Sequence, residues 1–312
     1  MSQQQTKKIG LLIGSEKDLP EALITTLNQS PHITAELVKI GGTKVEDTCP
    51  YHLIIDRISH DIPYYRAYVK FAAAQGTFII NNPFTWSADN KFFGATITRK
   101  LGMHSPKTII LPNKYISKDA TVDTFRNLAY PLNWKSIIDY VGIPAILKDI
   151  ISGGRPAVFR VHNEDELMER YDESGTRTMI LQEIIESNTH IHGFVIGQED
   201  VMLLQYDPVN GRYLPDTITD KHPFHQQLTK ASIALTTQYR YNINMVEFVI
   251  KNNTPYVINS TNPVPVIDKT LMNQEQFNWL IQTITKAIIN RVQHPRQQRA
   301  IIGFNEAAAL TD

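Results

Sequence analysis

The sequence of 312 residues contains a single cysteine, Cys49, so a framework of disulfides within the chain is excluded. One isolated thiol is typical of proteins that fold in a reducing compartment, and we expect a cytoplasmic location. No run of 18 apolar residues occurs, which argues against a membrane-spanning helix. The first residues, MSQQQTKK, are polar and do not resemble the apolar core of a secretory signal.

The chain also has no excess of charge of either sign. Its 31 Lys and Arg residues balance 31 Asp and Glu residues. A balanced chain creates no long-range field that would attract nucleic acid or an anionic membrane, so we predict neither partner. Apolar residues make up 42% of the chain, and its length favours about two domains or three small ones.

Two common nucleotide-binding motifs are missing. The first strand leads into GLLIGSEKD, which does not have the GxGxxG spacing of a dinucleotide site. The segment GGTKVED has the wrong glycine spacing for a P-loop, and its Thr43 precedes Lys44. These departures disfavour a dinucleotide enzyme and a P-loop ATPase.

The expected order of elements changes along the chain. In the first third, apolar runs such as KIGLLIG and YHLIIDRI alternate with helical stretches, which favours a mostly parallel sheet covered on both faces. A further helix pattern covers Ser87–Gly102. The pattern from Thr108 to Glu186 is β-α-β-β-α-β. After His190 strands dominate, with a hairpin turn at Lys251–Thr254 and a closing helix over 273–293.

Four histidines could form a zinc site, because two lie on one predicted strand and two in a predicted loop. They are His190, His192, His222 and His225. Imidazole nitrogens do bind zinc, but a chain with ten histidines brings some of them together by chance. We favour chance over a zinc site.

The segment PAILKDIISGGRPAVFRV reads as two apolar strands joined by a loop that contains Gly153 and Gly154. This loop has two possible interpretations, a hairpin connection or a phosphate-binding loop. A glycine pair is the usual choice for an ordinary hairpin connection. Glycines also let backbone N–H groups approach a phosphate, and Lys148 before the loop would add positive charge.

Three other features of the sequence, taken in their order around this loop, are relevant to a nucleotide site. Lys91 precedes it, the apolar strand MILQEII follows it, and Glu247 and two asparagines come later in VEFVIKNNTPYVINSTNPVP. Oxygen atoms at two neighbouring strand ends are suitable ligands for Mg²⁺. Each feature alone is more often structural, and only their combination indicates a nucleotide site.

The chain resembles the ATP-grasp superfamily, which includes glutathione synthetase, D-alanine–D-alanine ligase and the ribosomal-protein glutamate ligases. It is most similar to an uncharacterised bacterial group of that superfamily. The resemblance runs through nearly the whole chain and includes YHLIIDRISHDIPYYRAYVK, GTFIINNPFTWSADNKFFGATITRKLG, YPLNW, LQEIIE, QYDPVNGRY and NPVP. It implies an α/β and α+β fold. A Rossmann-like pre-domain would span 1–105, a small lid 106–188, and an antiparallel-sheet subdomain 189–312, with ATP clasped between the last two.

The resemblance also implies the residues of the site. Its phosphate-binding groups would be Lys91, Lys148 and the loop amides of Ser152, Gly153 and Gly154. The adenine would contact Gln182, Glu183 and Ile185. A magnesium ion would be held by Glu247, Asn259 and Asn262, and the catalytic group would be Lys148 together with His192 or Arg57 at the substrate carboxylate.

The implied function is that of an ATP-dependent carboxylate–amine ligase acting through an acylphosphate. ATP and Mg²⁺ would be the cofactors, and an amino acid or peptide would supply the carboxylate and the amine. A homodimer is compatible with this resemblance. The sequence names neither substrate nor pathway, because substrate-selecting loops follow no transferable code.

This chain departs from the superfamily at several positions. Asp149 follows Lys148 where a proline is usual, and the loop SGGRP is poorer in glycine. His192 replaces a frequent arginine and Gln205 a frequent lysine. The usual second metal carboxylate is also missing, because VINSTNP has Asn259 and Ser260 at those places. An alternative is therefore a catalytically degenerate homologue that binds a nucleotide or peptide as a regulatory partner.

Overall fold

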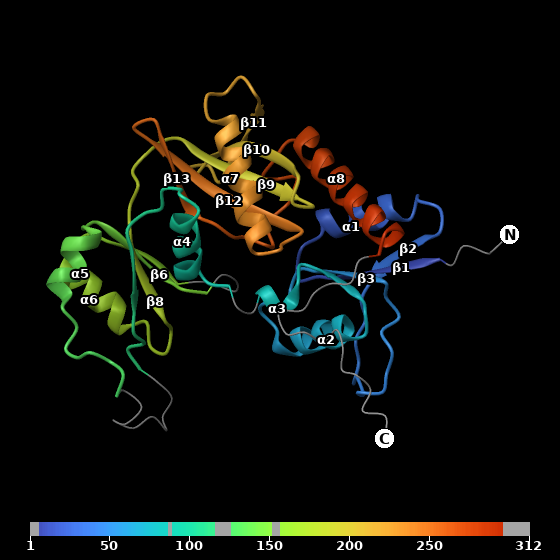
Figure 1. The fold of residues 1–312 in the computed structure, drawn as a ribbon, viewed down its shortest axis with the longest axis horizontal. Coiled ribbons are helices and arrows are strands. Elements are labelled where there is room, and N and C mark those ends of the chain that lie inside the picture. The colour runs from blue at the N-terminus through green and yellow to red at the C-terminus, as the bar shows by residue number, and fades with distance from the viewer. Residues whose placement is uncertain (1–5, 87–88, 116–125, 152–156, 296–312) are drawn as a thin grey trace. The chain divides into compact units, whose positions relative to one another are not determined.

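The computed structural model describes residues 6–86, 89–115, 126–151 and 157–295 (Figure 1). The chain forms two compact units. The first unit consists of residues 1–88, 190–246 and 261–312, and the second of residues 89–189 and 247–260. This division follows contacts in space, whereas the three predicted segments follow the chain, and those segments remain a prediction. In the described part of the chain, no helix combines the length and apolar character needed to cross a bilayer.

A parallel sheet opens the first unit, as the alternating pattern predicts. Its strand order is β2-β1-β3-β4 and all three pairings are parallel. The strands are β1 (Lys7–Leu12), β2 (Ile33–Leu37), β3 (Leu53–Asp56) and β4 (Phe78–Ile80). The helices of this unit's first and last segments are α1 (Asp18–Leu27), α2 (Pro63–Ala74), α3 (Pro83–Trp86) and α8 (Gln274–Gln293).

Both faces of this sheet are covered, which confirms the predicted arrangement. On one face, Ile9 and Ile55 pack in a core with residues of α1 and α8, and these two helices lie side by side (Figure 1). On the other face, Ile54 and Ile79 pack with Val69 of α2. Because each strand alternates its side chains between the faces, both halves of an apolar strand are used.

The second sheet is antiparallel, with the strand order β11-β10-β9-β12-β13. Its strands are β9 (His190–Ile196), β10 (Asp200–Asp207), β11 (Arg212–Ile218), β12 (Ile243–Lys251) and β13 (Thr254–Asn259). The first unit contains β9 to β11 and β12 as far as Val246. The predicted turn between β12 and β13 is confirmed, since Asn252 and Asn253 have the positive φ angles of a tight hairpin.

Helix α7 (His225–Gln238) and strand β11 were not predicted from the sequence, and His225 begins the helix rather than lying in a loop. The buried face of α7 explains the omission, because it combines Leu228 and Leu235 with two polar residues, Ser232 and Thr236. Ser232 fits there because Gly193 of β9 has no side chain. A Cβ atom on Gly193 would lie 2.5 Å from the Ser232 hydroxyl oxygen.

The second unit contains an antiparallel sheet of order β5-β8-β6-β7 and the predicted β-α-β-β-α-β sequence of elements. Its elements are α4 (Lys91–Lys100), β5 (Thr108–Leu111), α5 (Trp134–Val141), β6 (Ala145–Asp149), β7 (Val158–Val161), α6 (Glu164–Asp172) and β8 (Met179–Glu183). The predicted helix over Ser87–Gly102 is shorter in the structure. It begins after Asn90, whose side chain accepts the Phe93 N–H and caps the first turn.

Only one face of this second-unit sheet packs into the core that includes α5 and α6 (Figure 1). That face carries Leu147 and Leu181, which are fully buried. Because strand side chains alternate, the opposite face carries Ile110, Lys148 and Gln182. Ile110 is 42% exposed. The sheet therefore presents a partly apolar face with a lysine on it.

Asn81, which follows β4, stabilises the first unit through its buried amide. It accepts the N–H groups of Asn242 and Ile243 at 2.6 and 2.9 Å, and donates to the carbonyl oxygens of Ile243 and Pro263 at 2.6 and 3.0 Å. We expect Asn81→Ala to lower the free energy of unfolding by about 2–5 kcal/mol, since it leaves several buried backbone groups unpaired. Urea unfolding measures this. Asn278→Ala on the exposed side of α8 is the control, and equal stability of both variants would contradict the assignment.

Candidate functional site

Lys148 is the centre of the candidate site. It lies near the end of β6, paired with Val158 and Ile180 on the neighbouring strands. The pKa of Lys148 is lowered to about 8, mainly because burial disfavours its charged form. The negative charge of Glu247 opposes this shift, and the positive charge of Lys91 adds to it. A lysine with these neighbours is suited to receive an anion.

Lys91 is the first residue of helix α4, and it contacts the segment that follows β6. Its backbone N–H donates to the Ile150 carbonyl at 2.9 Å, and its Nζ donates to the Ile151 carbonyl at 2.7 Å. Burial lowers the pKa of Lys91, and the charges of Asp149 and Glu247 oppose the change. A cation at a helix N-terminus is unfavourable to the helix dipole, which indicates that this lysine serves something other than helix stability.

Asp149 replaces the proline that is usual after the second lysine, and the structure gives it a local role. Its carboxylate accepts the Ile151 N–H at 3.0 Å, while its own N–H donates to Ala157 at 2.9 Å. The side chain thus shapes the start of the loop after β6. The loop residues Ser152, Gly153 and Gly154 lie outside the described residues.

Glu247 and Asn259 face each other on β12 and β13. They are register partners, and the Asn259 side-chain N–H₂ donates to a Glu247 oxygen at 2.9 Å. Together they offer one carboxylate and one amide oxygen. Such oxygens suit a hard divalent cation, whose remaining positions would be filled by water and phosphate. The donor set of this pair therefore fits magnesium, with one negative charge.

The predicted adenine contacts lie at the end of β8 and just beyond it. Gln182 is buried and its amide donates to the Thr108 hydroxyl at 3.0 Å. Glu183 closes the end of the β5–β8 pair, because its carboxylate accepts the Lys107 N–H at 3.0 Å and its own N–H donates to the Lys107 carbonyl at 2.9 Å. Ile185 is also buried. All three belong to the second unit, as do Lys91 and Lys148.

The other predicted residues belong to the first unit. Arg57 follows β3, is 5% exposed, and pairs with the Glu16 carboxylate at 2.8–3.1 Å. Its Nη2 also donates to the Pro265 carbonyl at 2.8 Å. Within the described part of the chain, its buried Nη1 has no hydrogen-bond partner. The structure therefore gives Arg57 a structural ion pair, which sequence patterns did not predict, and leaves one donor atom unused.

His192 lies on β9 inside an aromatic cluster. Its ring stacks on Tyr206 with centroids 4.6 Å apart, and its Nδ1 is 3.0 Å from the Tyr213 hydroxyl.

Asn262, the third predicted metal ligand, pairs its backbone with Met245, and its side-chain oxygen accepts the Val264 N–H at 3.3 Å. Among the described residues, no group of three or more His, Cys, Asp and Glu side chains is arranged to hold a metal ion.

No family model matches the sequence, and no curated protein has a similar sequence. Solved structures do match. The D-alanine–D-alanine ligase of Bacillus anthracis, complexed with ATP, is 14% identical with a TM-score of 0.66, over 93% of this chain and 99% of that one. A RimK domain ATP-grasp protein of Sphaerobacter thermophilus is 16% identical with a TM-score of 0.64, over 90% and 99%.

A third match is the RiPP-associated ATP-grasp ligase of Chryseobacterium gregarium, in complex with ADP and with a leader and core peptide. It is 13% identical with a TM-score of 0.63, over 96% of this chain and 100% of that chain. Identities this low establish the fold alone. The chain has the ATP-grasp fold, over nearly its full length.

Proposed function

We propose that this protein is an ATP-dependent carboxylate–amine ligase. The observation that carries the proposal is that Lys91, Lys148 and Glu247 lie near one another in the second unit. The negative charge of Glu247 acts on the pKa of both lysines. The shared fold with ligases whose structures contain ATP or ADP supports a nucleotide as the ligand. The face of the sheet opposite α5 and α6 would receive it.

The proposed reaction has two steps. A carboxylate oxygen of the substrate attacks the γ-phosphorus of ATP, an O–P bond forms, and the bond to the bridging oxygen of ADP breaks. An amine nitrogen then attacks the acyl carbon, the C–N bond forms, phosphate leaves and the nitrogen loses a proton. Lys91 and Lys148 would neutralise the phosphate charge. Mg²⁺ held by Glu247 and Asn259, with Asn262 as the third predicted ligand, would supply further positive charge.

The substrate carboxylate is assigned to Arg57 in this proposal, in preference to His192. The unused Nη1 of Arg57 is a buried donor, and a buried unpaired donor is costly unless a ligand completes it. His192 already contacts two tyrosines. The substrates would be a small carboxylate and an amine, each an amino acid or a peptide.

ADP release tests the proposal directly. The protein would be incubated with ATP, millimolar Mg²⁺ and a panel of amino acids and short peptides. We expect release to depend on an added substrate pair and to be lost in Lys148→Ala. Release that persists in Lys148→Ala would remove this site from the reaction.

A second candidate function is nucleotide or peptide binding without turnover. The observation that favours it is the Asn259 amide, which donates to an oxygen of the Glu247 carboxylate and adds no charge of its own. ATP binding in calorimetry together with no ADP release across the whole panel would favour this alternative over a ligase.

We expect ATP binding to take up a proton above pH 8. With a pKa of about 8, Lys148 is mostly neutral at pH 8.5, and a bound phosphate favours its charged form. Uptake should therefore be roughly three quarters of a proton at pH 8.5 and about a tenth at pH 7. Calorimetry in buffers of different ionisation enthalpy measures it. Lys148→Arg, which stays charged, should abolish the uptake, and uptake unchanged in that variant would assign it to another group.

A further inference from the structure

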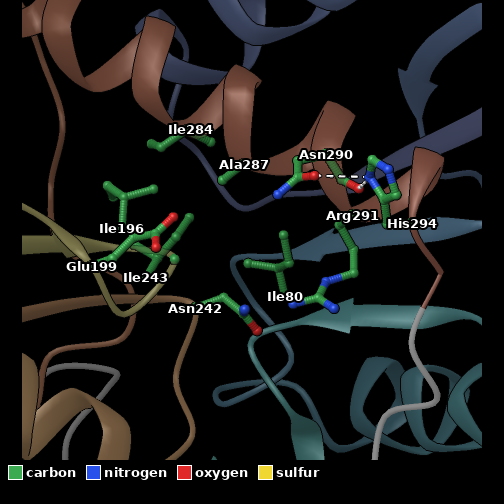
Figure 2. A pocket seen from close by; sticks show the side chains of 11 residues that line it. Ile80, Ile196, Glu199, Asn242, Ile243, Ile284, Ala287, Asn290, Arg291 and His294 are labelled. Carbon is green, nitrogen blue, oxygen red and sulfur yellow. Dashed lines mark hydrogen bonds between the residues drawn. The ribbon is translucent and has the colours of Figure 1, made fainter.

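A separate cavity of about 400 Å³ lies within the first unit (Figure 2). Its lining comes from the ends of β4 and β9, the β9–β10 turn, the start of β12, and the last turns of α8 and the residue beyond them. None of these residues belongs to the candidate ATP site. A cavity of this volume is at the lower end of the range for small-ligand pockets.

One side of the cavity is aliphatic. Ile80, Ile196, Ile243 and Ile284 contribute to the lining, each from a different element, and each is at most 5% exposed. The surrounding backbone is fixed by hydrogen bonds, since the Gly197 N–H donates to the Asn242 carbonyl at 2.7 Å. The pocket therefore has a preformed apolar wall that would bind an aliphatic group.

Charged groups of opposite sign stand on opposite sides of the cavity. Figure 2 shows Glu199 beside Ile196 and Ile243, and Arg291 on the other side near Ile80. The Arg291 guanidinium lies over the Phe78 ring, 4.5 Å from its centroid. A guanidinium is planar and carries its N–H donors in a fork that matches a carboxylate, so an arginine in this lining suits a carboxylate ligand.

Amide and imidazole groups complete the polar lining. Asn290 and His294 are joined through the His294 Nδ1 and the Asn290 side-chain oxygen at 2.9 Å (Figure 2). Asn242 adds a second amide. With one carboxylate and one guanidinium, the lining does not favour a polyanion such as a nucleotide. The separated charges favour a ligand that carries one charge of each sign.

We propose that this cavity binds a small zwitterion with an aliphatic side chain, a free amino acid or a dipeptide. Its ammonium group would pair with Glu199, its carboxylate with Arg291, and its side chain would contact the four isoleucines. The proposal does not depend on ATP binding, because it uses no residue of the second unit.

The test is calorimetry on the full chain with L-leucine and glycyl-L-leucine as probes. Two further probes each remove one charge, namely 4-methylpentanoate, which has no amine, and 3-methylbutylamine, which has no carboxylate. We expect saturable binding of at least one zwitterion and binding weaker by about tenfold or more for both single-charge probes. Binding of neither zwitterion would overturn the proposal.

Variants locate the binding in this cavity. Glu199→Gln and Arg291→Gln should each weaken zwitterion binding by about tenfold, while Lys286→Gln, an exposed residue of the same helix, should not. If Arg291→Gln unfolds because the Phe78 contact is lost, the affinity of Glu199→Gln, a substitution in the β9–β10 turn, tests the site instead. Unchanged affinity in Glu199→Gln would overturn the site. Lys148→Ala should bind the zwitterion normally, which separates this proposal from the ATP site.

Discussion

Lys148→Ala is expected to lose ATP binding, with an affinity at least about a hundredfold below that of the parent protein. Burial disfavours the charged form of Lys148, and its pKa of about 8 reflects that cost. A phosphate group that approaches it recovers this cost by pairing with the ammonium. Removing the side chain therefore removes both a charge and a site already desolvated for an anion.

The control for this prediction is Lys135→Ala. Lys135 lies on α5 in the same unit, is exposed, and pairs with Asp139 at 2.7 Å across one helical turn. Its removal changes the net charge equally but should leave ATP affinity within about twofold, because surface pairs contribute little. Calorimetry with Mg·ATP compares the three proteins, and thermal unfolding shows that each is folded. An unchanged affinity in Lys148→Ala would mean that the nucleotide, if bound, lies elsewhere.

The sequence was most informative where apolar periodicity and turn chemistry agreed. Alternating strands and helices predicted the parallel sheet, and the predicted turn at Lys251–Thr254 is the tight hairpin between β12 and β13. The pattern was uninformative for α7, because Ser232 and Thr236 on its buried face reduce the contrast between apolar and polar sides. Tertiary packing against Gly193 stabilises that helix, and no local pattern records such a contact.

The candidate site was predictable only in part, for a related reason. The resemblance to the ATP-grasp superfamily predicted the two lysines, Lys91 and Lys148, but not the groups that they contact in the structure. Lys91 binds the carbonyls that follow β6, some 60 residues further along the chain. Arg57 pairs with Glu16 across 41 residues, and the Asn259–Glu247 contact depends on strand register. Polar contacts of this kind arise from the fold and follow no spacing rule. The cavity beside Arg291 is the extreme case, because its lining is drawn from three strands, one helix and the β9–β10 turn.

Asn259→Asp is expected to strengthen Mg·ATP binding by about tenfold to a hundredfold, or roughly 1.4–2.7 kcal/mol. The structure places the Asn259 amide 2.9 Å from a Glu247 oxygen, so an aspartate would create two adjacent carboxylates. A divalent cation between them gains a second negatively charged ligand without a change in geometry.

Without the cation, the same substitution should be unfavourable. Two carboxylates this close repel each other, and one of them takes up a proton more readily than usual. Lys91 and Lys148 reduce this cost, since both feel the charge of Glu247. We therefore expect Asn259→Asp to unfold at a lower temperature than the parent protein in EDTA, and to recover when Mg²⁺ is added. This readout does not depend on turnover.

The matched control is Asn253→Asp, which adds the same charge to the exposed turn of the same β12–β13 hairpin. Asn253 has a φ of 61°, a conformation that aspartate also tolerates. Ser260→Glu tests the neighbouring position, which is 5% exposed, and should destabilise the protein without improving affinity. If Asn259→Asp gains neither Mg·ATP affinity nor Mg²⁺-dependent stability, the metal does not bind at the Glu247–Asn259 pair. The positive charge that a metal would bring to the phosphates would then have to come from Lys91 and Lys148 alone, as in a nucleotide-binding protein that works without a metal at this position.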